Sequence, residues 1–138
     1  IVSSKKEGDL ATPKGTFELG TLYYRKDNSQ PLKCKIKKKI IKKKMGWCND
    51  SRSKKYNKEI SFPFKYGAEK LYRKDKIYDL FINIKYNTCP VIKDKGSAIF
   101  LHIADNKYKP TKGCIAISKN DFLKILPLIN NKTKISIS

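Results

Sequence analysis

Hydrophobic and polar residues alternate in several stretches of the chain, and this period of two predicts β-strands. The clearest stretch covers residues 77–86, in which Tyr78, Leu80, Ile82, Ile84 and Tyr86 alternate with Asp79, Phe81, Asn83 and Lys85. Residues 16–24 show the same period, so we expect one face to carry Phe17, Leu19, Thr21 and Tyr23. Residues 133–138 form a last alternating strand. Residues 97–104 are apolar at nearly every position, which is typical of a central strand buried on both faces.

One short helix is expected near residues 119–126. Ser118 lies three residues before Asp121, which is the spacing of a capping box, and four apolar residues follow at helical intervals: Phe122, Leu123, Ile125 and Leu126. Pro127 limits this helix, and a short apolar strand over residues 114–118 precedes it. The pattern as a whole predicts a mainly β fold with one short α-helix.

Three other segments are expected to be irregular or exposed. Residues 8–15 contain glycine at each end and an internal proline, which indicates a turn-rich loop. Residues 46–58 show no periodicity and are predicted to form a long loop that carries the only tryptophan. Long irregular loops in compact domains are often functional. The basic run from Lys33 to Lys44 fits either a short basic helix or an edge ribbon with a solvated lysine face.

The length of 138 residues fits a single domain over 1–138, and 39% hydrophobic content is typical of a globular chain. The 32 lysine and arginine residues outnumber 12 acidic residues, so the net charge of +20 favours polyanionic partners. Only Arg25, Arg52 and Arg73 are arginines, which weakens the case for nucleic acid. No stretch approaches the roughly 20 apolar residues of a membrane helix. No secretory signal is visible, although the chain begins at Ile1.

The cysteines at 34, 48, 89 and 114 form no C-x-x-C pair, and His102 is the only histidine. These residues lack any familiar metal-ligand spacing, so we expect neither a metal nor a cofactor. A disulfide such as Cys34 to Cys48 remains an alternative in an oxidising compartment.

His102 and Cys114 are the candidates for chemistry. Singly, a histidine in an apolar strand is usually a core residue, and a lone cysteine is usually a small buried hydrophobe. Together they fit an acyl-transfer site, since we expect their strands to form a hairpin-like pair that brings the side chains within reach. A thiol needs a neighbouring base or positive charge to react as a thiolate, which His102 and Lys112 supply. Gly113 leaves backbone amides free to turn toward an oxyanion.

The chain resembles the L,D-transpeptidase catalytic domain, also called the YkuD domain. The most specific segments are Gly-Ser-Ala-Ile-Phe-Leu-His-Ile-Ala over 96–104 and Pro-Thr-Lys-Gly-Cys-Ile-Ala-Ile over 110–117. The resemblance extends to Glu7-Gly8-Asp9, residues 12–17, residues 46–50, Tyr56-Asn57, Leu71-Tyr72-Arg73 and Tyr78-Asp79-Leu80, so it spans most of the chain. It implies a β-sandwich or barrel and further N-terminal strands that precede Ile1.

The resemblance implies a bacterial enzyme of peptidoglycan biosynthesis, cell wall and cell shape. In this reading Cys114 attacks the carbonyl of the L-centre diamino acid in a donor stem peptide and expels the terminal D-amino acid. His102 is the base, the carbonyl of Ile103 orients its ring, and amides around Gly113 and Cys114 form the oxyanion hole. The side-chain amine of an acceptor stem then attacks the thioester. A periplasmic or cell-envelope location and a monomer without a membrane span or nucleic-acid partner also follow.

Several residues are candidates for binding the substrate. The aromatic ones each also fit ordinary packing within the protein, and Asp50 fits either substrate binding or ordering of the Trp47 loop. The candidates are Trp47, Tyr56, Asn57, Tyr86, Thr111 and Lys112, with Tyr72 as a further aromatic residue.

Two departures from the family pattern leave the type of cross-link open. Lys112 stands where the usual Ser/Thr-His-Gly-Cys motif has histidine, and Ala116 stands where arginine or asparagine is common. Hydrolysis of the same acyl-enzyme, as in an L,D-carboxypeptidase or endopeptidase, is the second interpretation. A non-catalytic polyanion-binding module that uses Lys33 to Lys44 is the third, and no known nucleic-acid-binding motif supports it.

Overall fold

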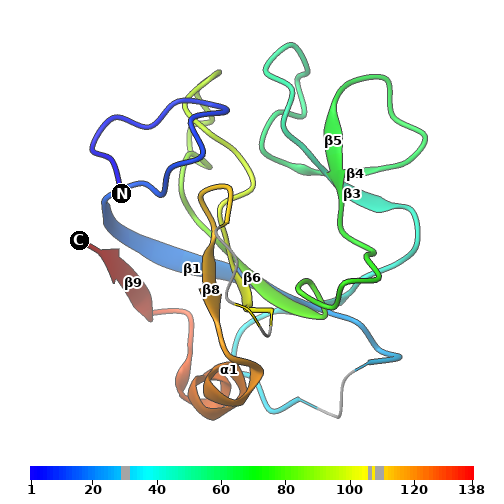
Figure 1. Cartoon of the computed structure of the whole chain (residues 1–138), viewed down its shortest axis with the longest axis vertical. Helices are drawn as coiled ribbons and strands as arrows, with labels where there is room; N and C mark the ends of the chain where they lie inside the picture. The colour runs from blue at the N-terminus through cyan, green and yellow to red at the C-terminus, as the bar shows by residue number, and fades with distance from the viewer. Residues whose placement is uncertain (29–31, 106, 108–110) are drawn as a thin grey trace.

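Two β-sheets and one short α-helix form the secondary structure of the protein, described by a computed structural model for residues 1–28, 32–105, 107 and 111–138 (Figure 1). The larger sheet has the order β2-β1-β6-β7-β8, with β9 also paired to β1, and the smaller sheet has the order β4-β3-β5. The strands of the larger sheet are β1 (Gly15–Tyr24), β2 (Lys38–Ile40), β6 (Leu80–Ile84), β7 (Phe100–Ile103), β8 (Ile115–Ile117) and β9 (Lys134–Ile137). The smaller sheet contains β3 (Met45–Cys48), β4 (Glu59–Ser61) and β5 (Ala68–Lys70).

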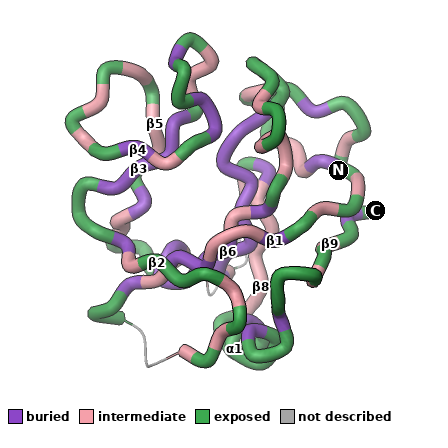
Figure 2. The backbone as a smooth tube through the Cα atoms, turned by 180° about the vertical axis from the view of Figure 1, so that it is seen from behind, coloured by how far each residue is buried: buried purple, intermediate pink, exposed green. Residues whose placement is uncertain are grey.

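Both faces of the larger sheet are covered, and for this reason its central strands β6 and β7 are apolar except for Asn83 and His102 (Figure 2). On one face, aliphatic side chains such as Leu22, Ile82 and Leu101 pack with Phe122 of the helix. On the other face, an aromatic layer packs toward the smaller sheet and contains Tyr23, Trp47, Tyr78, Phe81 and Phe100. Each fully buried side chain of this size stabilises the fold by about 1.5–3 kcal/mol.

The helix lies where the capping pattern predicts it. Helix α1 (Lys119–Ile125) begins after Ser118, whose side chain accepts a hydrogen bond of 3.1 Å from the backbone N–H of Asp121. A 3₁₀ turn, η1 (Leu126–Leu128), contains Pro127 and ends the helical segment. The prediction of a mainly β fold with one short helix is therefore confirmed, as are the strands expected around residues 16–24, 77–86, 97–104, 114–118 and 133–138.

The prediction of a single uniform face along β1 is wrong because the strand contains a β-bulge. Leu19 pairs with Ile84 and Leu22 pairs with Ile82, so three steps along β1 match only two along β6. The side chain of Asn83 occupies the bulge and accepts a 2.8 Å hydrogen bond from the N–H of Thr21. Leu19 and Leu22 consequently face the helix side, whereas Tyr23 joins the aromatic layer.

The expectation of a continuous loop over residues 46–58 is also wrong. Trp47 lies on β3, the central strand of the smaller sheet, and all four residues of this strand are buried. Burial on both faces removes the alternation that identifies a half-exposed strand, so the pattern gave no signal here.

The strands that carry the two candidate catalytic residues pair differently from the prediction. β7 and β8 are parallel neighbours rather than the two strands of a hairpin. The basic run contains β2, which lies at the edge of the larger sheet and pairs in parallel with β1. Of the two alternatives for that run, the edge ribbon is the one observed.

Candidate active site

A cavity of about 630 Å³ opens beside β7 and β8 on the aromatic side of the larger sheet. Its walls come mainly from the N-terminal segment, the segment from β5 to β6, the segment that contains β7, and the turn before β8. The cavity wall is rich in charged and polar side chains, among them Lys5, Glu7, Glu69, Arg73, Tyr78, His102, Lys112 and Cys114.

The parallel pairing of β7 with β8 places Cys114 and His102 on one face of the sheet. His102 pairs with Ala116, and Cys114 lies two residues before Ala116, so both side chains project toward the cavity. The Cys114 sulfur accepts a hydrogen bond from the N–H of Phe100 at 3.4 Å, and the thiol donates to the carbonyl of Ala98 at 3.2 Å. The nucleophile candidate is thus fixed against the backbone of β7.

His102 is held in one tautomer. Its Nδ1 lies 2.9 Å from the carbonyl oxygen of Ile103, and because a carbonyl only accepts, Nδ1 carries the proton. The lone pair is therefore on Nε2, the nitrogen that a base needs. Burial lowers the pKa of His102 below its usual value, so the imidazole is neutral at pH 7.

Cys114 is a neutral thiol in the free protein. Burial raises its pKa to about 12, and the nearby carboxylate of Glu69 acts in the same direction. The Phe100 N–H, the Tyr78 hydroxyl and the charge of Lys5 act in the opposite direction and favour the thiolate. The site therefore rests as an uncharged thiol beside an uncharged imidazole.

Tyr78 is a site residue that its sequence pattern did not reveal. The alternation of residues 77–86 indicated a strand face, but β6 begins only at Leu80, and Tyr78 lines the cavity. Its ring meets His102 edge-on with centroids 5.5 Å apart, and its hydroxyl donates a short hydrogen bond to Glu69. Arg73 lies 3.7 Å from the same carboxylate and also pairs with Asp75. Burial raises the pKa values of both Tyr78 and Glu69.

Asn57 connects the smaller sheet to Ala98, the residue whose carbonyl accepts the hydrogen bond from the Cys114 thiol. Its side-chain oxygen accepts hydrogen bonds from the Trp47 indole at 2.9 Å and from the N–H of Ala98 at 3.0 Å. Its amide nitrogen donates to the carbonyls of Tyr86 and Asn87 at 3.0 and 2.8 Å. Ala98 has a φ of +54°, a strained conformation for a residue with a side chain, and the bond from Asn57 helps to hold it.

The residues predicted to bind substrate fall into two groups. Thr111 and Lys112 line the cavity, and the Thr111 hydroxyl donates to the carbonyl of Cys114. Trp47, Tyr56 and Asn57 are buried in contacts with the protein itself.

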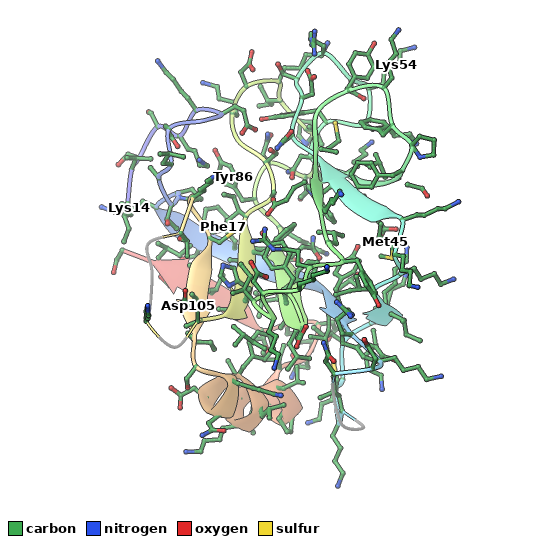
Figure 3. All side chains as sticks on the ribbon, turned by 45° about the vertical axis from the view of Figure 1, so that its right-hand side comes forward. Lys14, Phe17, Met45, Lys54, Tyr86 and Asp105 are labelled. Carbon is green, nitrogen blue, oxygen red and sulfur yellow. The ribbon has the colours of Figure 1, made fainter. Side chains whose placement is uncertain are left out.

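Two further aromatic candidates lie outside this cavity. Tyr86 lines a separate hollow of about 490 Å³, packs edge-on against Phe17 (Figure 3) and donates to the carbonyl of Lys95 at 2.6 Å. Tyr72 lies beneath the guanidinium of Arg25, 3.5 Å from its ring centroid.

The turn before β8 needs glycine at position 113, both for its backbone conformation and for the space around it. Gly113 has a φ of +103°, and a side chain there would lie 2.6 Å from the carbonyl oxygen of Ala11. The N-terminal segment around Ala11 therefore packs directly on the turn that contains the backbone amides of residues 113 and 114.

The four cysteines are free thiols in the structure, and Cys48 is buried in β3. Within the described residues no group of three potential metal ligands comes together. Asp50 orders its own loop by accepting hydrogen bonds from the N–H groups of Arg52 and Gly67.

A mainly β domain with a cysteine and a histidine facing one polar cavity defines the class of protein. The family model of the L,D-transpeptidase catalytic domain, YkuD, matches residues 1–137. Because this match covers nearly the whole chain, the protein belongs to the YkuD family of L,D-transpeptidase catalytic domains. No curated protein and no solved structure matches the chain significantly. In the part of the chain that the structure describes, no helix is long and apolar enough to cross a membrane.

Replacing Asn57 by glycine is expected to lower the free energy of unfolding by about 3 kcal/mol, because buried hydrogen-bonding groups lose their partners. Glycine keeps the φ of +56° accessible, so the variant isolates the side chain from backbone strain. Urea denaturation measures the loss. Asn49→Gly, at an asparagine whose side chain makes none of these contacts, is the matched control. An unchanged midpoint for Asn57→Gly would contradict the supporting role.

Proposed function

We propose that the protein is a peptidoglycan L,D-transpeptidase that forms cross-links between stem peptides through a thioester on Cys114, with His102 as the base. The observation that supports this function is the shared cavity of Cys114 and His102, with the Nδ1 of His102 bound to the carbonyl of Ile103. This arrangement leaves Nε2 as the acceptor for the thiol proton.

In the first half-reaction, Nε2 of His102 takes the proton from Cys114 as the sulfur attacks the carbonyl carbon of the donor's L-centre diamino acid. The negative charge on the carbonyl oxygen is stabilised by the backbone N–H groups of Gly113 and Cys114. When this intermediate collapses, the C–N bond breaks and His102 returns the proton to the departing amine. The terminal D-amino acid leaves, and the donor remains as a thioester.

In the second half-reaction, the side-chain amine of an acceptor stem attacks the thioester carbon. His102 removes a proton from this amine as the C–N bond forms. The C–S bond then breaks, and the proton returns to Cys114, so the free thiol is regenerated without any cofactor. Thr111 positions the Cys114 turn through its hydrogen bond, and Lys112 stands at the mouth of the cavity, where the family motif usually has histidine.

The proposed substrates are the donor and acceptor stem peptides of the bacterial cell wall, which places the protein in the cell envelope. Stem peptides carry carboxylates, and the net charge of +20 favours association with such an anionic polymer. Neither a membrane-spanning segment nor nucleic acid is part of this function.

The test is intact-protein mass spectrometry after mixing the protein with purified disaccharide-peptide fragments, followed by analysis of the products. The expected adduct has the mass of the donor minus its terminal D-amino acid, maps to Cys114, and is accompanied by dimeric muropeptides. Cys89→Ala is the matched control, because Cys89 is an exposed free thiol and its loss should leave the adduct unchanged. An adduct that yields only shortened or separated stems would instead identify a hydrolase. A folded protein that forms no adduct would contradict the proposal.

A further inference from the structure

The N-terminal segment is built into the wall of the cavity at two points. The N–H of Glu7 donates to the carbonyl of Asp94 at 2.7 Å, and the Glu7 carboxylate accepts hydrogen bonds from Tyr56 at 2.7 Å and Ser97 at 2.6 Å. On the other side, the carbonyl of Ala11 closely approaches Gly113. The segment that contains Asp9 is therefore held at a fixed place relative to Gly113 and Cys114.

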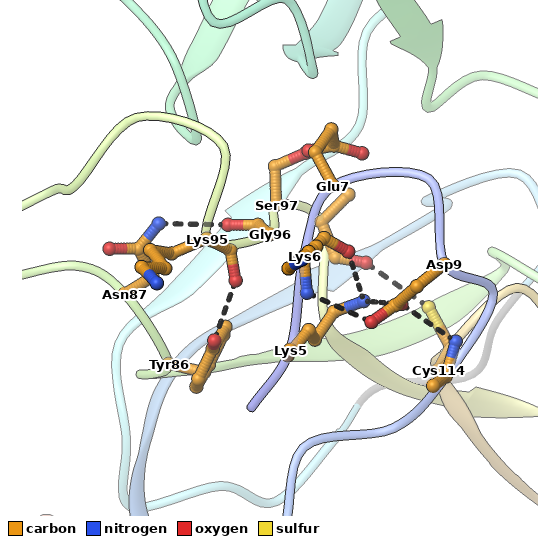
Figure 4. A network of polar contacts seen from close by, with 12 residues as sticks. Lys5, Lys6, Glu7, Asp9, Tyr86, Asn87, Lys95, Gly96, Ser97 and Cys114 are labelled. Carbon is orange, nitrogen blue, oxygen red and sulfur yellow. Dashed lines mark hydrogen bonds and ion pairs between the residues drawn. The ribbon is translucent and has the colours of Figure 1, made fainter. Parts of the chain in front are cut away.

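Lys5 is bound to this segment through Asp9, and its charge is buried. Its side chain is only 4% exposed, and its ammonium group lies 2.7 Å from the carboxylate of Asp9. The aliphatic part of the Lys5 side chain passes so close to Gly96 that a Cβ atom at position 96 would lie 2.7 Å from Cε of Lys5. Figure 4 shows the Lys5 side chain extending toward Asp9 and Cys114, and both Lys5 and Cys114 line the cavity. Burying an ammonium group is unfavourable unless fixed partners compensate for the lost water.

Asp9 shares its carboxylate between Lys5 and two backbone amides, and the Lys5 ammonium also donates to the carbonyl of Lys6 at 3.4 Å. The two amides are the N–H groups of Lys6 at 2.8 Å and Ala11 at 3.0 Å, and the Asp9 side chain is 26% exposed. Burial raises the pKa of Asp9, but the hydrogen bonds from Lys5 and from these two amides lower it to about 2. Water screens the more exposed carboxylate, whereas the buried ammonium faces the cavity with less screening.

The other cations at the cavity are poorer sources of positive potential. Arg73 is paired with Asp75 and Glu69, and the side chain of Lys112 is exposed. Several acidic or neutral titratable groups face the same space from the surrounding elements, namely Glu7, Glu69, Asp75, Tyr78, His102 and Asp105. When His102 takes the proton, its imidazolium is one positive charge beside the thiolate, and a second, fixed positive charge nearby stabilises the thiolate further.

We propose that Lys5 is a positioning residue whose fixed positive charge stabilises the thiolate of Cys114. This inference rests on the proposed function of Cys114 as the nucleophile. Lys5 touches none of the reacting atoms and takes no part in proton transfer; it acts through space on the sulfur. The N-terminal segment thereby contributes to reactivity as well as to the shape of the cavity.

The test measures the rate of alkylation of Cys114 by iodoacetamide across a range of pH. Peptide mass spectrometry separates Cys114 from the other three cysteines. Lys5→Met is expected to slow alkylation of Cys114 about tenfold at pH 8, since losing a nearby opposite charge shifts a pKa by about one unit. Lys6→Met removes the same charge from an adjacent exposed lysine and is expected to change the rate less than about twofold.

Two more variants separate charge from packing. Lys5→Arg keeps the charge and should restore the pH profile to within about threefold of the unmodified protein. Lys5→Gln can still donate a hydrogen bond to Asp9 and replaces Lys5→Met if the latter does not fold. A loosened cavity would expose the sulfur and speed alkylation, which is opposite in sign to the loss of charge. Equal rates for Lys5→Met and Lys6→Met, or a faster rate for Lys5→Met, would overturn the inference.

The alkylation assay contains no peptidoglycan, so its result is independent of whether the protein cross-links stems. If Cys114→Ser retains turnover, the proposed function fails, whatever the pH profile of the Lys5 variants. If Cys114→Ser loses turnover while Lys5→Met alkylates normally, only the role of Lys5 fails.

Discussion

Replacing Cys114 by serine is expected to lower the rate of cross-linking at least about 10³-fold while the domain stays folded. A hydroxyl is a far weaker acid than a thiol, so the neutral imidazole of His102 cannot generate the nucleophile efficiently. Serine retains both hydrogen-bonding functions of the residue, because it can accept from the N–H of Phe100 and donate to the carbonyl of Ala98. Turnover of purified muropeptides, measured beside a thermal melt, tests this prediction.

Cys34→Ser is the matched control for this substitution. Cys34 makes the same type of contact, a thiol donating to a backbone carbonyl, in this case that of Ile36 at 3.3 Å, but it lies outside the cavity. Its replacement should leave the cross-linking rate within about twofold of the unmodified protein. Normal turnover by a folded Cys114→Ser variant would remove Cys114 from the mechanism.

Replacing His102 by glutamine is expected to reduce cross-linking by about 10²–10⁴-fold, which is the usual contribution of a general base. The glutamine amide can donate to the carbonyl of Ile103 in place of Nδ1, yet it has no basic nitrogen. Steady-state rates on muropeptides provide the measurement. A variant that retains the rate of the unmodified protein would show that another group accepts the proton.

The pH dependence gives His102 a second signature. Because burial lowers the pKa of His102, the neutral base persists below pH 6.5, and activity falls only as the pH drops through this lowered value. The folded protein also binds this proton less readily than the unfolded chain. The contribution of His102 to the free energy of unfolding is therefore fully present above pH 6.5 and is lost as the pH falls toward the lowered pKa. His102→Gln should lose this component of the acid dependence, which separates it from the titration of carboxylates.

The elements that could be predicted from the sequence are those determined by residues close together in the chain. Alternation identifies β6, and the spacing of Ser118 and Asp121 identifies the start of α1. The bulge in β1 depends on the side chain of Asn83 from another strand, which no local pattern contains. β4 and β5 are three residues long each, so their alternation is too short to recognise. The parallel pairing of β7 with β8 is set by the path of the whole chain.

The candidate site divides in the same way. Cys114, Gly113 and His102 lie in segments whose local sequence resembles the family motif, so they were accessible without a structure. The link from Asn57 to Ala98 joins residues 41 positions apart and is visible only after folding. Lys5 could not be distinguished by type in a chain with so many lysines. Its burial, which depends on Gly96 and Asp9, sets it apart from them.

The position of β2 at the edge of the larger sheet has a consequence for self-association. In the described part of the chain its outer edge pairs with no further strand, and such an edge is a template for pairing with a second molecule. Lys37 and Lys38 are exposed at this edge, with Lys42, Lys43 and Lys44 just beyond it. A second copy would bring an identical row of ammonium groups against the first, and repulsion opposes this contact over about 8 Å at physiological ionic strength. The basic run thus protects an open sheet edge from edge-to-edge aggregation, and added salt weakens that protection.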